Sequence, residues 1–510
     1  MTQESCQSCD NLSNGTQQTL NVKEKGTDSN FSCENKSNSA IPRVVDTLIV
    51  GNGPSAIFLS YLLHGFVPFY DCKSEGPHPD RIIHGILSRY PDLSLYEIFE
   101  TVGIEAITRH FDSNLVYAKQ ALRFNILLDA LLRPNGDLDT DPSLNKSRIK
   151  FKYDPSKQID HLVVGHSAVP GGQWSEDTEN EDSLTLSYAD MLSLPPYSTG
   201  QYILNSEGRE LPAFSRLTRS QAKGYYATYP AEVGISDSFL SSYKVANISR
   251  ISFGRFDVLL KSHNDLLHIK CSRVILASGL FSCALPPPKI LASFTPLSHP
   301  NYSLPVLILG SGFTAADSVL YHLSKNRQVI HIYKWDNTLN SPSPLKACHP
   351  QAYPEYSAIY RYMKSKKAEN YTGYPNAEIT SAEMKNGNLE IVINPNGESE
   401  TQQQPSVTVT VGTVKSCVGR RTKLDYLLPH FSDELKDLHF DENGYLRKDG
   451  FLPRVVKVID KGTPNDSSKR RLGFEVMHNI WVIGSLTGDS SLVRFAFGGV
   501  VGAANDLLNS

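Results

Sequence analysis

Two short runs of aliphatic residues in this chain lead directly into glycines. The first is Val44–Val50, a β-branched run without the alternation of a half-exposed strand, and the second is Pro305–Leu309. A helical pattern follows each glycine turn, over Ala56–Leu63 and over Ala315–Leu323. Continuous apolar runs of this kind are typical of parallel strands buried on both faces. The pattern therefore predicts two units of one design, each a strand, a glycine turn and a helix.

Further short apolar runs have the same character. Each run is followed by Gly, Ser or a charged residue, as strands of an open α/β sheet are where loops form a ligand crevice. We therefore expect an α/β fold with two Rossmann-like dinucleotide-binding domains. The runs are Leu162–Val164, Arg273–Ala277, Gln328–Tyr333 and Ile480–Ile483.

The N-terminal segment has a different composition. Residues 1–42 are rich in Ser, Asn, Thr, Gln and Lys and nearly lack large apolar side chains, so burial cannot offset the entropy of ordering them. We predict a disordered tail, the segment through which protein partners would bind. Cys6 and Cys9 have the spacing of a metal or redox pair, but no second Cys or His pair stands at ligand spacing, so no metal site is predicted.

Composition and charge narrow the classes of partner. The formal net charge of −3, from 50 basic and 53 acidic residues, gives no electrostatic reason to expect nucleic acid. The chain shows neither a signal peptide nor an apolar run long enough for a transmembrane segment, which predicts a cytoplasmic protein. The eight scattered cysteines do not resemble a disulfide framework and are expected to be reduced thiols.

The first glycine turn has the G-x-G-x-x-A spacing of a pyrophosphate site. Its first glycine makes the tight turn, the second lets a pyrophosphate approach the backbone, and the small third residue lets helix and strand pack closely. The N-terminus of the helix offers N–H groups and a positive dipole end to the phosphates. The predicted contacts with this first dinucleotide are Gly51, Gly53, Pro54, Ser55 and Ala56.

An acidic residue for the ribose is expected about 20 residues after the turn. Asp71 and Glu75 are available there, but the run before them contains a proline, which a central strand would not tolerate. The alternative second strand is His161–Val164, which is followed by Gly165 and His166 instead of an acid. The ribose ligand is therefore left open between these positions.

The second glycine turn predicts a second pyrophosphate site, so the two nucleotides would be FAD and a nicotinamide donor. Lys334 stands at the end of the next strand, where an NAD enzyme would carry an acid, and a cation there favours the 2′-phosphate of NADPH. Arg327 is a second candidate for that phosphate. The predicted contacts in the turn are Gly310, Ser311, Gly312, Phe313, Thr314 and Ala315.

A G-G-x-W segment after the alternative second strand resembles flavoprotein monooxygenases of the flavin-containing, Baeyer–Villiger and amine N-hydroxylating kind. That resemblance implies that Gly171 and Gly172 approach the isoalloxazine ring of FAD and that Trp174 packs nearby. Gln173, between them, is also predicted to contact FAD. The segment Leu184–Pro195 is similar to the flavin-lining segment of the N-hydroxylases. Their substrate lysine is replaced there by Ala189, which argues against ornithine or lysine as substrate.

Three further segments are similar to this superfamily. Ala277–Gly279 resembles its crossover between the FAD and NADPH domains, and His299 with the following proline resembles the pair before the second turn. The segment after Ile480 resembles the return of the chain to the flavin, which implies that Asp489 bonds the ribityl or phosphate side of FAD and that Arg494 adds an anion contact.

Taken together, these motifs resemble the oxidative stress-induced growth inhibitor family, from Val44 to the C-terminus and including Tyr353–Tyr356. The resemblance implies an FAD- and NADPH-dependent, monooxygenase-like protein that restrains proliferation and promotes cell death, with links to cytokinesis. The expected domains are an FAD-binding domain over 43–300 and 415–510, with an insertion at about 76–160, and an inserted NADPH-binding domain over 301–414.

Three functional hypotheses follow. In the first, NADPH reduces the flavin, O₂ adds to it, and the resulting flavin peroxide oxidises an unidentified small molecule. No catalytic residue is predicted, and His166, His299 and His349 are candidates by type only. In the second, a regulatory or scaffolding protein retains the flavoprotein fold without turnover. A disulfide reductase is a weaker third hypothesis, because the one close cysteine pair lies in the tail.

Overall fold

The computed structural model describes most of the chain after residue 42. The described residues are 43–114, 117, 122–135, 146–294, 300–336, 342–395, 405–433, 435, 474–487 and 499–509. The predicted tail, with Cys6 and Cys9, lies outside them, as do His299, Asp489 and Arg494. What the sequence predicts for these residues stays a prediction.

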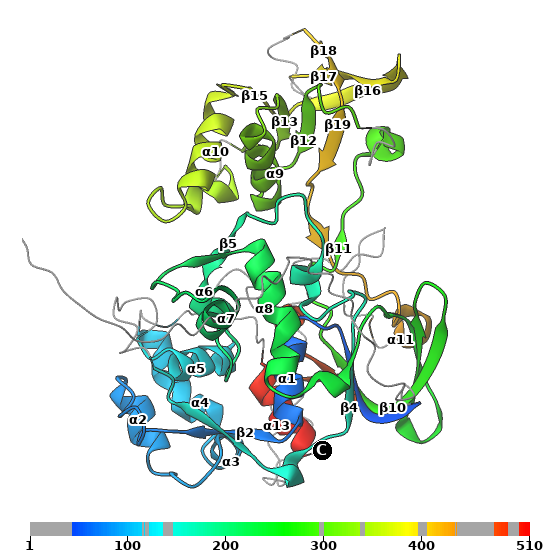
Figure 1. Cartoon of the computed structure of the whole chain (residues 1–510). Coiled ribbons are helices and arrows are strands. Elements are labelled where there is room, and N and C mark those ends of the chain that lie inside the picture. Colours follow the sequence, from blue (N-terminus) through cyan, green and yellow to red (C-terminus); the bar gives the residue numbers. More distant parts are fainter. Residues whose placement is uncertain are drawn as a thin grey trace, which may run out of the picture. The chain divides into compact units, whose positions relative to one another are not determined.

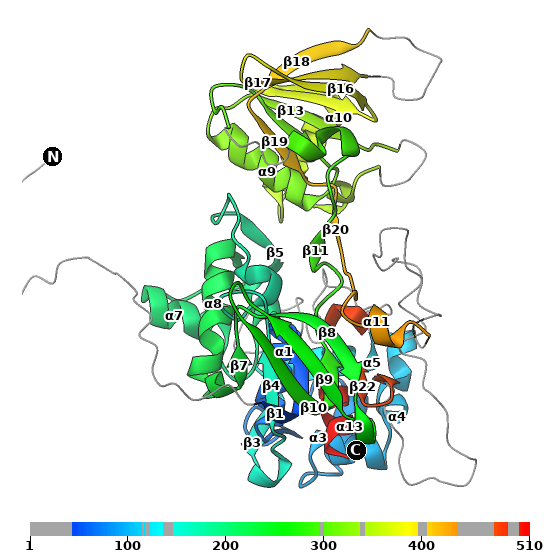
Figure 2. The same cartoon turned by 90° about the vertical axis from the view of Figure 1, so that its right-hand side faces the viewer.

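An eight-stranded sheet is built around β1 (Val44–Val50), whose residues Leu48 and Ile49 are fully buried. β1 pairs in parallel with β10 (Leu266–Leu276) on one side and with β4 (His161–Val164) on the other. Burial from both faces explains the absence of alternation in this run. The other strands are β7 (Phe239–Leu240), β8 (Lys244–Arg250), β9 (Phe256–Lys261), β21 (Glu475–Met477) and β22 (Ile480–Val482) (Figure 2).

Helix α1 (Pro54–Leu63) starts at the first glycine turn and is the central helix of this unit. Its proline occupies the first turn of the helix, where a missing N–H costs nothing. Almost every side chain of α1 is buried, because the helix packs against β4 and β2 and against α13 (Val500–Leu508) near the C-terminus (Figure 1). This enclosure explains a helix that is apolar on all sides.

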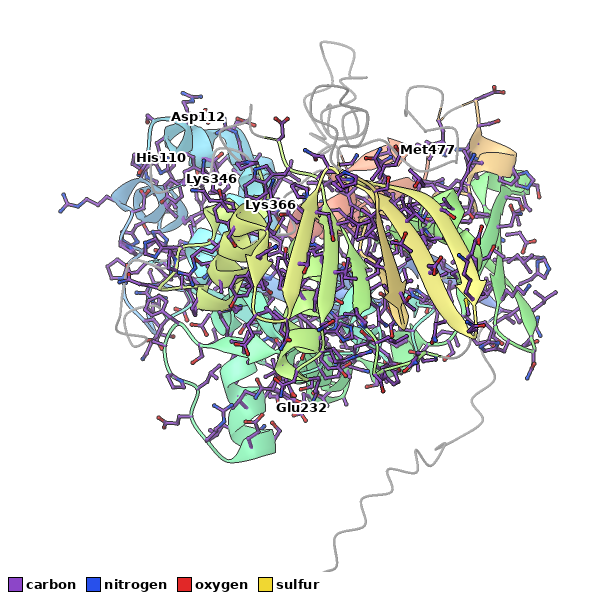
Figure 3. All side chains as sticks on the ribbon, turned by 90° about the horizontal axis from the view of Figure 1, so that it is seen from above. His110, Asp112, Glu232, Lys346, Lys366 and Met477 are labelled. Atoms are coloured by element: carbon purple, nitrogen blue, oxygen red, sulfur yellow. The ribbon has the colours of Figure 1, made fainter. Side chains whose placement is uncertain are left out.

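The predicted insertion folds onto the same core. Strand β2 (Phe66–Tyr70) does not join the large sheet: it pairs antiparallel with β3 (Ile149–Tyr153), and this two-stranded sheet accommodates Pro68. Asp80 and Ser94 cap the helices that follow by accepting backbone N–H groups. His110 bonds to Asp80 at 2.8 Å and is labelled in Figure 3. The helices are α2 (Arg81–Leu87), α3 (Leu95–Thr101), α4 (Ile104–Thr108) and α5 (Arg123–Leu132).

A helical layer rich in tyrosine follows β4. Helix α8 (Arg219–Glu232) begins with a capping box of Thr218 and Gln221, and three of its tyrosines are fully buried. Each buried hydroxyl donates to a backbone carbonyl, as a buried phenol requires; Tyr226, for example, bonds to Leu192 at 2.8 Å. The other elements are β5 (Leu184–Tyr188), α6 (Ala189–Leu192), α7 (Thr199–Glu207) and β6 (Arg216–Thr218).

The second unit repeats the design of the first. Four parallel strands stand in the order β15, β13, β12, β19, and α9 (Phe313–Ser324) and α10 (Pro354–Ser365) pack on the sheet. Lys366 ends α10 in a left-handed conformation, φ 64° (Figure 3). The strands are β12 (Val306–Leu309), β13 (Val329–Tyr333), β15 (Tyr371–Pro375) and β19 (Thr413–Ser416), with antiparallel β14 (Lys367–Ala368) and a separate sheet of β16 (Glu378–Lys385), β17 (Asn388–Asn394) and β18 (Val407–Val411).

Two sheets whose central strands are parallel, each with a glycine turn and a helix after one central strand, confirm the predicted α/β fold class. The choice between two second strands is also settled, because β4 and not β2 is the neighbour of β1. In the described part of the chain, no helix combines the length and the apolar character needed to cross a bilayer.

Candidate functional site

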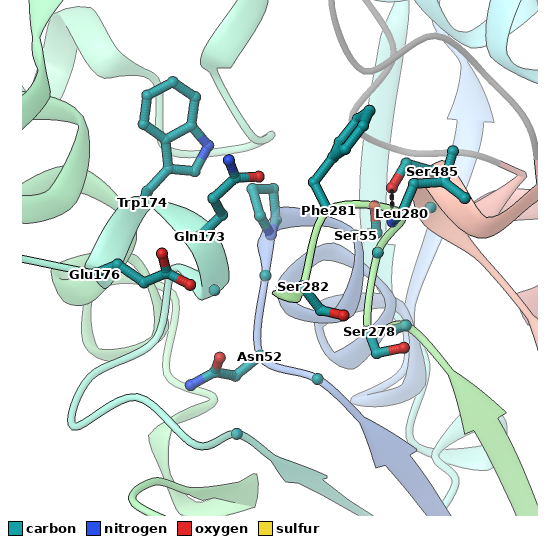
Figure 4. A pocket seen from close by; sticks show the side chains of 18 of the residues that line it. Asn52, Ser55, Gln173, Trp174, Glu176, Ser278, Leu280, Phe281, Ser282 and Ser485 are labelled. Atoms are coloured by element: carbon teal, nitrogen blue, oxygen red, sulfur yellow. Dashed lines mark hydrogen bonds between the residues drawn. The ribbon is translucent and has the colours of Figure 1, made fainter. Parts of the chain in front are cut away.

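A cavity of about 620 Å³ opens along the carboxyl edge of the first sheet and reaches the second unit. This volume lies in the range of roughly 300–1,000 Å³ that is usual for small-molecule and cofactor sites. The first turn lies in the middle of the close-up, with Gln173 and Trp174 on one side and Ser278 and Phe281 on the other (Figure 4). The lining includes Gly51, Gly53, Pro54, Ser55, Gly172, Gln173, Trp174, Ser278, Phe313, Thr314, Asp317 and Tyr356.

The first turn depends on glycine at its first position. Gly51 has φ 110°, and a Cβ there would stand 2.6 Å from the carbonyl oxygen of Ala277. Its N–H donates to Val164 at 2.8 Å, so the turn is fixed between the two neighbours of β1. Ala56 lies just inside the helix and is fully buried, as expected for the small residue that lets helix and strand pack.

The two glycine segments of the first unit touch each other. A Cβ on Gly172 would lie 2.8 Å from the Cα of Gly53, and the N–H of Gly171 donates to the carbonyl of Asn52 at 2.8 Å. The structure therefore brings together the turn and the G-G-x-W segment. Gly171 and Ala56 stand behind the lining, in supporting positions.

The C-terminal strand also reaches the cavity. β22 pairs with β10, which carries Gly484 and Ser485 to the first turn. A Cβ on Gly484 would meet the hydroxyl oxygen of Ser55 at 2.8 Å, and the hydroxyl of Ser485 accepts the N–H of Leu280 at 2.9 Å. The predicted return of the chain to the first turn is present up to this point, and Asp489 and Arg494 follow beyond the described residues.

At the predicted ribose end, Gly165 and His166 line the cavity. A Cβ on Gly165 would lie 2.0 Å from the Cγ of Asn52, so the side chain of Asn52 fills the space above Gly165. Asp71 and Glu75 lie elsewhere: Asp71 accepts N–H groups of a local turn, and Glu75 pairs with a lysine at 2.9 Å. Both follow β2, which is not part of the large sheet, and neither lines the cavity.

One wall of the cavity comes from α8, which carries no motif. The ring of Tyr226 packs on Trp174, with centroids 6.1 Å apart. Arg219 donates to the carbonyls of Gln173 at 3.0 Å and Glu176 at 3.3 Å, and burial lowers the pKa of its guanidinium. Tyr243 and Lys244 also line the cavity, where the N–H of Tyr243 donates to the carbonyl of Gly165 at 3.0 Å, and they were not predicted either.

The second turn is built like the first. Gly310 has φ 137°, and a Cβ there would stand 2.2 Å from the carbonyl oxygen of Cys417. His331 of β13 donates to the carbonyl of Gly310 at 2.7 Å and accepts from Tyr371, and burial lowers its pKa to about 4. A neutral imidazole therefore supports the turn. Ala315, in α9, is buried behind it.

Lys334 follows β13 directly and lies at the second turn, where its N–H donates to the hydroxyl of Ser311 at 2.8 Å. Arg327 precedes β13 and therefore stands at the opposite end of that strand. Its guanidinium contacts His322 at 2.9 Å and Thr413 at 3.3 Å. Lys334 and Arg327 therefore stand at opposite ends of β13, and a role for Arg327 at the 2′-phosphate stays a prediction.

Asp317 is the acidic residue that the second unit contributes to the cavity. It follows Phe313 and Thr314 on α9, and Tyr356 of α10 donates its hydroxyl to the carboxylate at 2.8 Å. Burial raises the pKa of Asp317 to about 6. His349, a candidate by type, is exposed and lies outside the lining.

Two sheets with parallel central strands, each followed by a glycine turn and a helix, define the class of two-dinucleotide-binding folds, and one cavity is lined by the first turn and by the start of α9. Among solved structures, bacillithiol disulfide reductase Bdr from Bacillus cereus has this fold, with a TM-score of 0.50 and 11% identity over 91% of this chain and 99% of that one. No protein-family model matches the chain. Within the described residues there is no group of three or more His, Cys, Asp or Glu that could hold a metal ion.

Curated relatives give the particular resemblance. Oxidative stress-induced growth inhibitor 1 of Mus musculus is 27% identical over 506 residues, which cover 90% of this chain and 94% of the mouse protein. Oxidative stress-induced growth inhibitor 2 of Homo sapiens is 24% identical, and the match covers 90% of this chain and 92% of the human protein. The resemblance to this family that the motifs predict is confirmed over nine-tenths of the chain.

Proposed function

We propose that the chain is an oxidoreductase that binds FAD at the first glycine turn and NADPH at the second, and that it acts as a monooxygenase on a small molecule with O₂. The observation that carries this proposal is the shared cavity. Residues of the first turn and residues at the start of α9 line the same space.

The glycines of the two turns fall into two groups that fit this proposal. Gly51 and Gly310 are required by the protein itself, because a Cβ at either would collide with backbone. At Gly53 the nearest atom to a Cβ is 3.9 Å away, and at Gly312 none lies within 4 Å. The packing of the chain does not demand glycine at these second positions, whereas a pyrophosphate that approaches the backbone does.

The roles of the residues follow from their places. The N-termini of α1 and α9 would orient the two pyrophosphates, and Lys334 would hold the 2′-phosphate of NADPH. Trp174 and Tyr226 would exclude water from the reacting end of the cavity. FAD, when bound, would supply the redox-active ring and the site of reaction with O₂, and NADPH the hydride. From the names of the relatives we also propose that the protein restrains cell growth under oxidative stress.

A regulatory or scaffolding role without turnover is the second candidate. One observation favours it: Gly165 and His166 follow β4, where an acidic ribose ligand would stand, and the side chain of Asn52 fills the space above Gly165. The affinity for FAD would then be lower, and the fraction of the protein that carries flavin would vary with the state of the cell.

Two alanine substitutions test the proposal at the two turns separately. Gly53→Ala should purify with little flavin, because its methyl group stands where a pyrophosphate approaches. Gly312→Ala should keep FAD and lose affinity for NADPH by about tenfold or more, or ~1.4 kcal/mol. Bound FAD is measured by visible absorption and NADPH affinity by titration calorimetry.

The control is Gly85→Ala. Gly85 lies in α2, and a Cβ there would have no neighbour within 4 Å. This variant should alter neither the amount of bound FAD nor the affinity for NADPH. Wild-type protein that is colourless and takes up no added FAD, or a Gly53→Ala variant that retains its flavin, contradicts the proposed first site.

A further inference from the structure

The Tyr353–Tyr356 motif joins the second unit to the tyrosine-rich layer of the first. Arg216 of β6 pairs with Glu355 at 2.7 Å and donates to the carbonyls of Thr185 at 2.6 Å and Ala352 at 3.3 Å. Its guanidinium lies 4.8 Å over the ring of Tyr353. The side chain of Arg216 is only 7% exposed, so this cluster, which we call the Arg216 clamp, fixes the start of α10.

The clamp also fixes Tyr356, one residue after Glu355. The ring of Tyr356 meets Phe313 edge to face, with centroids 5.2 Å apart, and its hydroxyl bonds to Asp317. Both Phe313 and Asp317 lie on α9, directly after the second glycine turn, and all three side chains line the cavity. The carboxyl of Asp317 is therefore held in the wall of the space that a ligand of this turn would enter.

Other charged groups near Asp317 are already engaged. Arg216 serves the clamp, and Arg219 donates to two backbone carbonyls. Burial raises the pKa of the Cys417 thiol to about 12, which keeps it neutral. The described groups that face Asp317 are Tyr356 and Glu355 from α10, Arg216 from β6, Arg219 from α8 and Cys417 after β19.

We propose that Asp317 takes up a proton when an anionic nicotinamide dinucleotide binds at the second turn, and that Tyr356, held by the Arg216 clamp, is its positioning residue. The proton moves from solvent to the carboxylate, while the Tyr356 hydroxyl keeps donating to the same group. An anionic ligand in the same cavity disfavours a second negative charge and so draws the proton to Asp317. This inference rests on the proposed NADPH site.

A carboxyl whose pKa lies at about 6 before binding is in the right range for such coupling near neutral pH. If the ligand raises that pKa further, affinity increases as the pH falls through the interval between the two values. Linkage sets the limit at about tenfold per pH unit for one proton.

The test is titration calorimetry of the FAD-loaded protein with tetrahydro-NADP, a ring-reduced analogue of NADPH that donates no hydride. Binding is measured in buffers of different ionisation enthalpy between about pH 6 and about pH 8, which gives the number of protons taken up. We expect uptake that approaches one proton in this interval and falls toward zero above it. The calorimetric readout does not depend on turnover.

Three variants assign the proton. Asp317→Asn should bind the analogue without uptake. Tyr356→Phe should move the uptake interval to higher pH, because the lost hydroxyl no longer stabilises the carboxylate. Tyr360→Phe, on the same helix but stacked on Trp335, is the matched control and should behave like wild type.

Unchanged uptake in Asp317→Asn, or wild-type binding without uptake, overturns the inference and leaves the proposed NADPH site intact. Wild-type protein that holds FAD but does not bind the analogue refutes the NADPH site itself, and the inference then fails with it.

Discussion

At the scale of single residues, the site depends on how closely backbone segments approach. Gly172 and Gly53 come from separate glycine segments, and a methyl group on Gly172 would lie 2.8 Å from the Cα of Gly53. This contact holds the G-G-x-W segment against the first turn. The packing of the protein alone therefore requires glycine at position 172.

Gly172→Ala should lower the stability of the protein by about 1–3 kcal/mol, because it adds both a left-handed strain and a backbone collision. Gly208 has a similar φ, 67°, but a Cβ there would meet open space. Gly208→Ala should therefore lower the stability by only about 1 kcal/mol. Thermal unfolding of the two variants measures the difference. Equal losses would show that the close approach contributes nothing.

The residues of the two turns could be predicted because their geometry is local: a strand, two glycines and a helix follow one another in sequence. Arg219 and Tyr226 were not predicted as site residues, because the packing of α8 against distant segments brings them to the cavity. Asp317 closely follows the second turn, but its contact with Tyr356 depends on the packing of α9 against α10. The ribose position stayed open for the same reason. It depends on which strand pairs with β1, and that is a long-range choice.

At the scale of elements, Arg216 of β6 joins the start of α10 to the first unit, while the rest of α10 packs on α9 and β15. Arg216 makes an ion pair, several bonds to backbone carbonyls and a ring contact in the Arg216 clamp. In the sequence, only the family resemblance distinguishes the motif Tyr353–Tyr356. Its physical role could not be read there, because its partner lies on β6.

Arg216→Ala should destabilise the protein by about 3–5 kcal/mol, since it leaves Glu355 and several carbonyls without a buried cation. Arg209→Ala removes an arginine whose ion pair with Glu207 is largely exposed, and should cost less than about 1 kcal/mol. Melting temperatures and denaturant midpoints measure both. A similar loss in the two variants would mean that the clamp carries no special stability.

At the scale of the whole molecule, each of the two units encloses a neutral histidine. His161 donates to the carbonyl of Ile159 and accepts from Ser60, while His331 supports the second turn. Burial lowers the pKa of both to about 4. The repetition of strand, turn and helix made the fold class predictable, but these internal supports depend on the finished packing.

Because the folded pKa of these histidines lies below the usual value of about 6.5, the unfolded chain binds more protons between about pH 6.5 and about pH 4. The stability they contribute is present above that interval and is lost as the pH falls through it, by up to about 3 kcal/mol each. His331→Gln keeps a donor for Gly310 and does not titrate, so its melting temperature should fall less steeply with acid. A slope equal to that of wild type would exclude His331 as a source.

If FAD and NADPH bind in the same cavity, NADPH can reduce the flavin directly, and anaerobic mixing of the FAD-loaded protein with NADPH measures this reduction. We expect the visible absorbance of the flavin to bleach, faster with NADPH than with NADH, and to bleach far more slowly in Gly312→Ala. Flavin that stays oxidised in the wild type, or that bleaches equally fast in Gly312→Ala, would be incompatible with the proposed NADPH site beside the flavin.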